Sequence, residues 1–150
     1  MKTYSEAELT AQPIGYWTGA AYRAVVGRIR ADLAVEQLGQ PHWWILNHVA
    51  GAPGTWEQGA LTERLTPYDD QGTDFAAVFG ELTGRGWLLR APDGSLTLTE
   101  AGEQGRLRAR ERSLRAHEQM HEGITPQEYA ATLTVLRRVI DNLGGDSDLP

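Results

Sequence analysis

The chain has 150 residues, of which 41% are hydrophobic, and this length and composition predict one domain with a sizeable core. A formal net charge of −6 at pH 7 excludes a general attraction to nucleic acid, so DNA binding would need a local basic patch. The chain has no cysteine, which excludes disulfides, a thiol redox switch and a thiolate zinc site.

The first residues, 1–13, lack the apolar core of a signal peptide. A membrane-spanning helix needs a run of about eighteen apolar residues, and the sequence contains none. We therefore expect a cytoplasmic protein that makes no membrane contact.

A long amphipathic helix is predicted over residues 14–37, with Pro13 at its first position and Gly39 beyond its end. Its apolar side chains form one stripe at helical spacing: Ile14, Trp17, Ala21, Val25, Ile29 and Leu33. A shorter apolar helix follows, opened by Pro41 and closed by Gly51.

Two short helices are predicted in the middle of the chain. The first opens with the capping box Thr55-x-x-Gln58 and closes at Leu65. The second is predicted over residues 71–82 and ends before Gly84. Its apolar side chains share one helical face: Phe75, Val78, Phe79 and Leu82.

A β-hairpin is predicted directly after these helices. Two apolar stretches, 87–89 and 96–98, flank a tight turn in which Gly94 can supply a positive φ. Two short helices followed by a hairpin indicate a winged helix-turn-helix, which we assign to a lobe over residues 40–98.

The remaining residues, 99–144, predict a polar, arginine-rich helix that continues to about Glu122, and then a final helix capped by Thr125 and Glu128. Apolar side chains of the final helix repeat with alternating spacings of four and three: Tyr129, Leu133, Leu136, Ile140 and Leu143. Such a seam favours a second copy of the chain as partner. The alternative is packing against the first helix of the same chain.

Several segments resemble the multiple-antibiotic-resistance regulator (MarR) family of bacterial transcription factors. ALTERL at 60–65, ELTGRGWLLR at 81–90 and LTLTEAGEQGR at 96–106 resemble that family's second-domain helix, the passage from its recognition helix into the wing, and the exit from the wing. Residues 124–128 and 14–17 resemble the start of its last dimerisation helix and the face of its first.

The resemblance implies a mainly α winged helix-turn-helix fold of about six helices and one β-hairpin wing. It also implies a homodimer formed through residues 9–38 and 99–144. The interface residues implied on the final helix are Leu133, Leu136, Ile140 and Leu143.

In the resembled family the recognition helix enters the major groove of double-stranded DNA and the wing reaches the minor groove or the backbone. The residues of this chain that would meet DNA are Arg64, Thr73, Asp74, Ala77, Arg85 and Arg90. Carboxylates surround the predicted recognition helix, which has no basic side chain: Asp69, Asp70, Asp74 and Glu81.

Two functions therefore stay open. One is a DNA-binding transcription regulator. The other is a winged-helix protein with an acidic recognition helix and a short wing that has lost ordinary DNA recognition and serves as a ligand-binding or protein-interaction module.

Aromatic residues mark a candidate effector site. The resemblance implies a crevice between the dimerisation helices and the winged lobe that takes small aromatic or apolar ligands. The residues that would line it are Tyr16, Trp17, His42 and Trp43. The alternative is that such rings fill the core, as we expect for Trp44 and Trp87.

A helix carrying His117-Glu118-x-x-His121 matches the H-E-x-x-H pattern of zinc peptidases. Such a site needs a third ligand from a later element and a cleft beside a sheet, and only a small hairpin is predicted. No nucleophile with a paired base and no phosphate-binding glycine loop is found. We therefore expect a solvated helix face, with no catalytic residue, metal site or cofactor.

Overall fold

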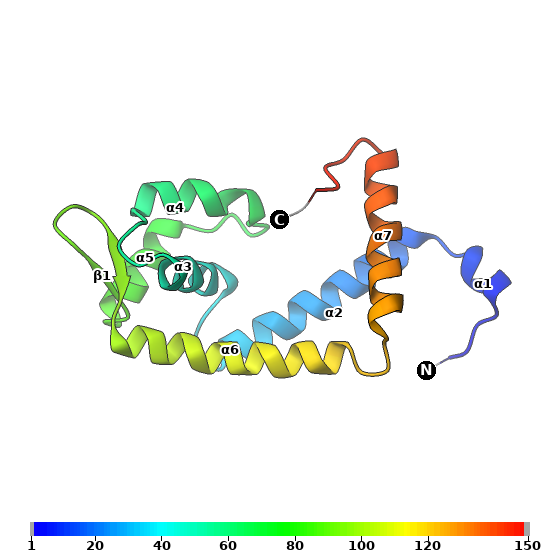
Figure 1. Ribbon diagram of the computed structural model, residues 1–150, viewed down its shortest axis with the longest axis horizontal. Helices are drawn as coiled ribbons and strands as arrows, with labels where there is room; N and C mark the ends of the chain where they lie inside the picture. The colour runs from blue at the N-terminus through cyan, green and yellow to red at the C-terminus, as the bar shows by residue number, and fades with distance from the viewer. Residues whose placement is uncertain (1, 149–150) are drawn as a thin grey trace. The chain divides into compact units, whose positions relative to one another are not determined.

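The computed structural model describes residues 2–148, and the chain divides into two compact units, Met1–Ala116 and His117–Pro150. The described residues form seven α-helices, one 3-10 helix and one two-stranded hairpin (Figure 1). In chain order these are α1 (Glu6–Thr10), α2 (Ile14–Ala34), α3 (Gln40–Gly51), α4 (Gln58–Leu65), η1 (Thr66–Tyr68), α5 (Phe75–Gly84), β1 (Leu88–Arg90), β2 (Leu96–Leu98), α6 (Glu100–Met120) and α7 (Pro126–Asn142). The mainly α winged helix-turn-helix that the sequence predicts is confirmed.

The helix α1 is missing from the sequence-based prediction. It begins with a capping box in which the Glu8 amide donates to the Ser5 hydroxyl oxygen at 3.3 Å and the Ser5 amide donates to the Glu8 carboxylate at 2.7 Å. The spacing Ser5-x-x-Glu8 was therefore the signal for a seventh helix.

The predicted ends of two other helices were wrong. The Thr55 capping box does not form, because α4 begins at Gln58 after Glu57, and the Thr55 amide donates to the Ala52 carbonyl in a turn. The long helix ends at Ala34 rather than at residue 37. Its last turn is closed by Gln37, which has a φ of 55°.

The recognition helix also begins later than predicted, at Phe75 instead of residue 71. The residues before it form a loop in which Gly72 has a φ of 68°. This loop is stabilised by Asp69 and the helix is capped by Asp74, as described below.

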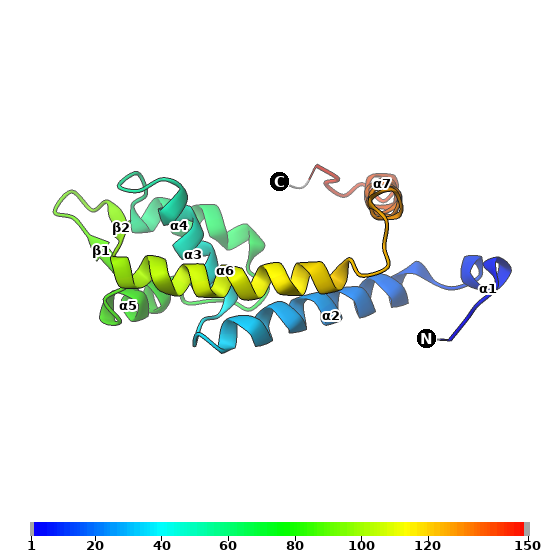
Figure 2. The ribbon, with the colours of Figure 1, turned by 60° about the horizontal axis from the view of Figure 1, so that its bottom comes forward.

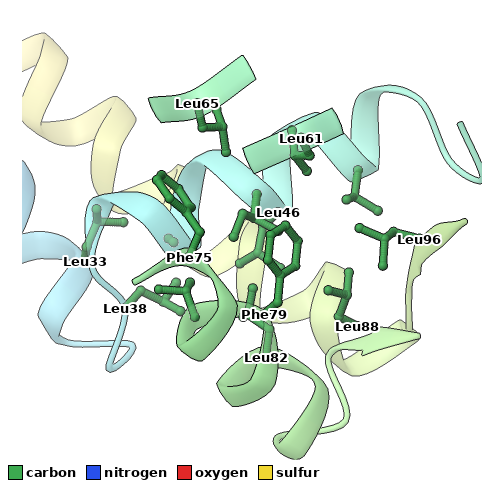
Figure 3. Packing of buried hydrophobic residues seen from close by; sticks show 14 residues of the cluster. Leu33, Leu38, Leu46, Leu61, Leu65, Phe75, Phe79, Leu82, Leu88 and Leu96 are labelled. Carbon is green, nitrogen blue, oxygen red and sulfur yellow. The ribbon is translucent and has the colours of Figure 1, made fainter. Parts of the chain in front are cut away.

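The core of the first unit is built around α3. Three of its side chains, Ile45, Leu46 and Val49, are completely buried. The other elements supply the rest of the cluster (Figure 3), mainly through Leu33, Leu38, Leu61, Leu65, Phe75, Phe79, Leu82, Leu88 and Leu96. Trp44 and Trp87 pack against this cluster while half-buried, as the sequence predicted. Burial of this apolar cluster is the main term that stabilises the lobe.

The hairpin is pinned to the helical part of the lobe. Leu88 pairs with Leu98 and Arg90 pairs with Leu96, and Gly94 has the positive φ, 88°, that the turn requires. The Leu96 amide also donates to the Trp56 carbonyl at 2.8 Å, so the connection between α3 and α4 is bonded to the second strand.

Two glycines let Trp87 approach α6 closely. A Cβ atom on Gly102 would overlap the Trp87 carbonyl oxygen, and one on Gly105 would overlap its indole ring. The same carbonyl accepts from the Thr99 amide at 3.0 Å, so the backbone at the start of the wing cannot easily shift. These glycines therefore fix the wing against the first turns of α6.

In the second unit, α7 begins with the predicted capping box. The Glu128 amide donates to the Thr125 hydroxyl oxygen at 3.2 Å, and the Thr125 amide donates to the Glu128 carboxylate at 2.8 Å. No residue of α7 is buried, and Leu133 at the centre of the apolar seam is 44% exposed. The seam is thus only partly covered within this unit, where Leu136 and Ile140 are half-buried and the Tyr129 ring contacts His121. No helix among residues 2–148 is long and apolar enough to cross a membrane.

Replacing Gly102 with Ala is expected to lower the free energy of unfolding by about 1–3 kcal/mol, because the new methyl group meets a fixed carbonyl. The matched control is Gly80→Ala in α5, where a Cβ would meet no atom within 4 Å. Alanine should stabilise that position by up to about 1 kcal/mol through its helix propensity. Guanidinium denaturation followed by circular dichroism measures both effects, and equal changes for the two variants would contradict the packing argument.

Candidate nucleic-acid interface

The start of the recognition helix α5 is organised by two carboxylates. Asp74 accepts from the Ala77 amide at 3.1 Å and so caps the helix. Asp69 accepts from the Thr73 amide at 2.6 Å and from the Thr73 hydroxyl at 2.7 Å. The hydrogen bond from the Thr73 amide lowers the pKa of the Asp69 carboxyl most, and the bond from the Thr73 hydroxyl lowers it further. Both carboxylates therefore face the chain's own donors.

The third carboxylate, Asp70, is paired with a cation. Arg30 of α2 donates to both of its oxygens, at 2.8 and 3.0 Å, and the Tyr22 hydroxyl donates to the same group. The hydrogen bond from the Tyr22 hydroxyl lowers the pKa of the Asp70 carboxyl most, and the hydrogen bond and positive charge of Arg30 lower it further. The charge of Asp70 is thus balanced within the lobe.

The fourth carboxylate, Glu81, contacts His42 of α3, with 2.9 Å between Oε2 and Nε2. The Gly39 amide donates to Nδ1 of the same imidazole at 3.2 Å, so Nε2 carries the hydrogen and donates to Glu81. His42 consequently joins α3 to the middle of the recognition helix. The structure does not bring it together with Tyr16 and Trp17.

The exposed face of α5 carries one acidic residue, Glu81, whose side chain is 55% exposed, and otherwise small, uncharged residues: Ala76, Ala77, Gly80, Thr83 and Gly84. Thr73, predicted to meet DNA, lies before the helix with its hydroxyl already donating to Asp69. The structure therefore groups Thr73, Asp74 and Ala77 at the start of α5. It also shows that the four carboxylates of this region each form a hydrogen bond or an ion pair with a group of the same chain.

Three arginines predicted to meet phosphates lie around the lobe, and all three are exposed. Arg64 lies near the end of α4, 5.9 Å from the centre of the Tyr68 ring. Arg90, at the end of β1, hydrogen-bonds Gln58 at the start of the same helix. Arg85 follows α5 and donates to the Gln37 carbonyl oxygen at 2.8 Å. Arg64 and Arg90 are thereby held at the two ends of α4.

The predicted ligand residues do not form one cluster within the first unit. Tyr16 is 77% exposed, and Trp17 donates to the Gln12 side chain at 2.8 Å near the start of α2. Trp43 instead lines a small cavity at the other end of α2, where the lining residues of that helix lie twelve or more positions after Trp17. That spacing is about 20 Å along a helix.

The cavity beside Trp43 lies where the C-terminal half of α2 approaches α6 (Figure 2). It has a volume of about 10 Å³, which is room for about one water molecule. Its lining residues are Ile29, Asp32, Leu33, Trp43, Ala109, Ser113 and Ala116. Sequence reasoning missed Asp32 and Ser113, the polar members, because each is a single polar residue on a long amphipathic helix.

Two further residues missed from sequence are Tyr22 and Arg30, which meet Asp70. Their spacing of eight places both on one side of α2, but nothing in the sequence connects that side to residue 70.

The histidines of the H-E-x-x-H pattern lie close together, with ring centres 4.1 Å apart. The distance from His121 Nδ1 to the His117 carbonyl oxygen is 2.9 Å, a hydrogen bond that turns one ring nitrogen toward the backbone. Within residues 2–148, no three His, Cys, Asp or Glu side chains come together in a way that could hold a metal ion.

Models of protein families give no match, and neither do curated proteins. Among solved structures, the PcaV transcriptional regulator from Streptomyces coelicolor has 24% sequence identity and a TM-score of 0.72, covering 89% of this chain and 98% of its own. A MarR family protein of Mycobacterium tuberculosis, Rv2887, in complex with DNA has 19% identity and a TM-score of 0.64, covering 89% and 99%.

The chain has the fold of the MarR-family transcriptional regulators. The repressor CouR bound to p-coumaroyl-CoA shares this MarR fold, with 23% identity, a TM-score of 0.67 and coverage of 91% and 97%. Because the matches extend over almost the whole of each structure, α5 occupies the place of the recognition helix in the MarR fold, and β1 and β2 form its wing.

Replacing Asp74 with Ala is expected to lower the free energy of unfolding by about 0.5–2 kcal/mol, because the Ala77 amide loses its cap. Asp74→Asn removes the same charge but keeps a capping oxygen, so its stability should stay close to that of the parent chain. Thermal unfolding of the two variants measures the difference. A loss of equal size in both would mean that charge, and not capping, is the role of Asp74.

Proposed function

We propose that this chain is a DNA-binding transcription regulator, not an enzyme, that acts as a homodimer and responds to a small aromatic or apolar ligand. The observation that carries the proposal is the arrangement of the carboxylates around α5. Each of them bonds to a donor of the chain, and apart from Glu81 the exposed face of α5 carries only small, uncharged residues beside exposed arginines. Rv2887 in complex with DNA and CouR bound to p-coumaroyl-CoA, which share the fold, support both parts of the proposal.

For DNA, the proposal places α5 in the major groove with Thr73, Asp74 and Ala77 nearest the bases. Alanine can contact the methyl group of thymine, and an N-cap carboxylate can accept from cytosine. Arg64, Arg85 and Arg90 would bind phosphates, since guanidinium groups form paired hydrogen bonds with phosphate oxygens. Their present partners, an aromatic ring, a carbonyl and an amide, carry no negative charge that DNA would have to displace.

For assembly, the proposal uses the uncovered apolar surfaces. The seam of α7 leaves Leu133 and Leu143 exposed, and the first half of α2 exposes Ile14, Trp17 and Val25. Only the second half of that stripe, at Ile29 and Leu33, packs against the core. A second copy of the chain would bury these surfaces, and we keep Leu133, Leu136, Ile140 and Leu143 as its contacts.

For the ligand, we propose the cavity beside Trp43, which a ligand would have to enlarge because it now holds about one water molecule. His42 neighbours Trp43 on α3. Tyr16 and Trp17 are about 20 Å away along α2, so we infer that they could contact the same ligand only from a second subunit. A regulator of this kind would work in the cytoplasm, where bacterial DNA lies.

The second candidate function, a winged-helix protein that has lost ordinary DNA recognition, is supported by the lack of free basic groups around α5 among residues 2–148. No Lys or Arg lies within α5, and Arg64, Arg85 and Arg90 each have a partner within the chain. A protein that has lost ordinary DNA recognition would show the same features. It would act as a ligand-binding or protein-interaction module.

The DNA experiment selects bound fragments from the source genome and then measures their affinity over a range of salt concentrations. Arg90→Ala should weaken binding to all sequences and lower the salt slope by about 1, because one phosphate contact is lost. Arg115→Ala on α6 is the matched control and should leave both unchanged. Absence of binding to any fragment at moderate salt would reject the regulator and favour the second function.

Replacing Leu136 with Asp should give monomers or unfolded chain, because a charge would enter the apolar interface. Thr134→Asp lies on the opposite side of the same helix and should stay dimeric. Sedimentation equilibrium with circular dichroism separates the outcomes. A Leu136→Asp variant that is both folded and dimeric would disprove the assigned interface.

A further inference from the structure

Glu81, the acidic side chain on the exposed face of α5, is oriented by a histidine from another helix. Its Oε2 atom lies 2.9 Å from Nε2 of His42 in α3. The His42 side chain is 12% exposed and the Glu81 side chain is 55% exposed. A nearly buried imidazole therefore holds a carboxylate that stays open to solvent.

The contact fixes one carboxylate oxygen and leaves the other available. The Gly39 amide donates to Nδ1 of His42 at 3.2 Å, so Nε2 carries the hydrogen and donates to Glu81. The second oxygen, Oε1, accepts no hydrogen bond within residues 2–148. Glu81 thus presents an oriented acceptor to a molecule outside the chain.

The neighbours of Glu81 on this face do not shield it. Ala77 lies one helical turn before it, and a Cβ atom on Gly80 or Gly84 would meet no atom within 4 Å. The Thr83 hydroxyl donates to a backbone carbonyl of the same helix at 2.8 Å. Glu81 is therefore the side chain of this face that extends furthest toward an approaching surface.

A carboxylate in this position favours one base in the major groove. Cytosine presents its N4 amino group there, which donates to carboxylates. Guanine and thymine present acceptors that repel a carboxylate, and the amino group of adenine lies next to the acceptor N7. A glutamine, which has both a donor and an acceptor, pairs with adenine instead.

We propose that Glu81 reads a cytosine in the major groove and that His42 is the positioning residue that orients its carboxylate. This inference rests on the proposed function, because it requires α5 to enter the groove. It adds a base contact one helical turn beyond Ala77. The acidic residue of a helix that attracts no phosphate then serves as a source of sequence specificity.

The experiment selects bound sequences from a random pool of duplex DNA with the full chain and compares the base preference at every position. The parent chain should prefer cytosine at one position of each half-site. Glu81→Ala should lose this preference, which we expect to be about 5- to 150-fold. Glu81→Gln should change the preferred base at that position from cytosine to adenine, which a merely structural role of Glu81 would not produce.

The role of His42 is tested by the same selection. His42→Ala should weaken the preference for cytosine without changing the preferred base, because the carboxylate is present but no longer oriented. His42→Gln should restore part of the preference, since its amide offers an acceptor to the Gly39 amide and a donor to Glu81. The base preference is a ratio of affinities, so a lower fraction of folded protein does not change it.

The matched control is Glu63→Gln, which removes the same charge from an exposed position of α4 and should leave every base preference unchanged. The parent preference in Glu81→Ala, or in His42→Ala, would overturn the proposal while leaving the regulator intact, and so would equal changes in Glu63→Gln and Glu81→Gln. A parent chain that binds no DNA would instead reject the proposed function and this contact with it, so the two failures are distinguishable.

Discussion

The burial of α3 is the constraint on which the rest of the lobe depends. Its side chains Ile45, Leu46 and Val49 have no exposed surface, and every neighbouring element places apolar groups against them. The end of α2, both helices of the helix-turn-helix motif and the hairpin are consequently positioned by one cluster (Figure 3). A polar substitution in this helix would therefore disturb together the elements that we propose to face DNA.

The sequence was sufficient where local chemistry decides the conformation. The turn at Gly94 and the cap formed by Thr125 and Glu128 follow from residue types at fixed spacing, and both are confirmed. The start of α5 was misplaced because the competing bonds of Asp69 and Asp74 decide it, and a periodic pattern cannot rank two acidic residues as caps. The Thr55 box failed because its residues are held in a turn after α3.

The candidate site shows a second limit of sequence reasoning. A count of charges around the recognition helix predicts repulsion of phosphates, because a sequence gives the number of carboxylates but not the direction in which they point. The structure turns Asp69 and Asp74 toward backbone amides and pairs Asp70 with Arg30, forty residues away in the chain. Contacts between residues so far apart in the chain depend on the tertiary fold, so no local sequence pattern predicts them.

The helix α5 is connected at three points to the segment that precedes the motif: to α2, to α3 and to the connection between them. Arg30 of α2 holds the loop before it, His42 of α3 bonds its middle at Glu81, and Arg85 at its end bonds the carbonyl of Gln37. A small rotation of α2 would therefore act on both ends of α5, and a rotation of α3 would act on its middle. Since α2 also carries uncovered apolar residues and borders the cavity at Trp43, the proposed assembly and the proposed ligand binding would both bias this helix. In the proposed function, coupling between ligand and DNA would then require no contact between them, only a shift of α2 that these polar bonds transmit.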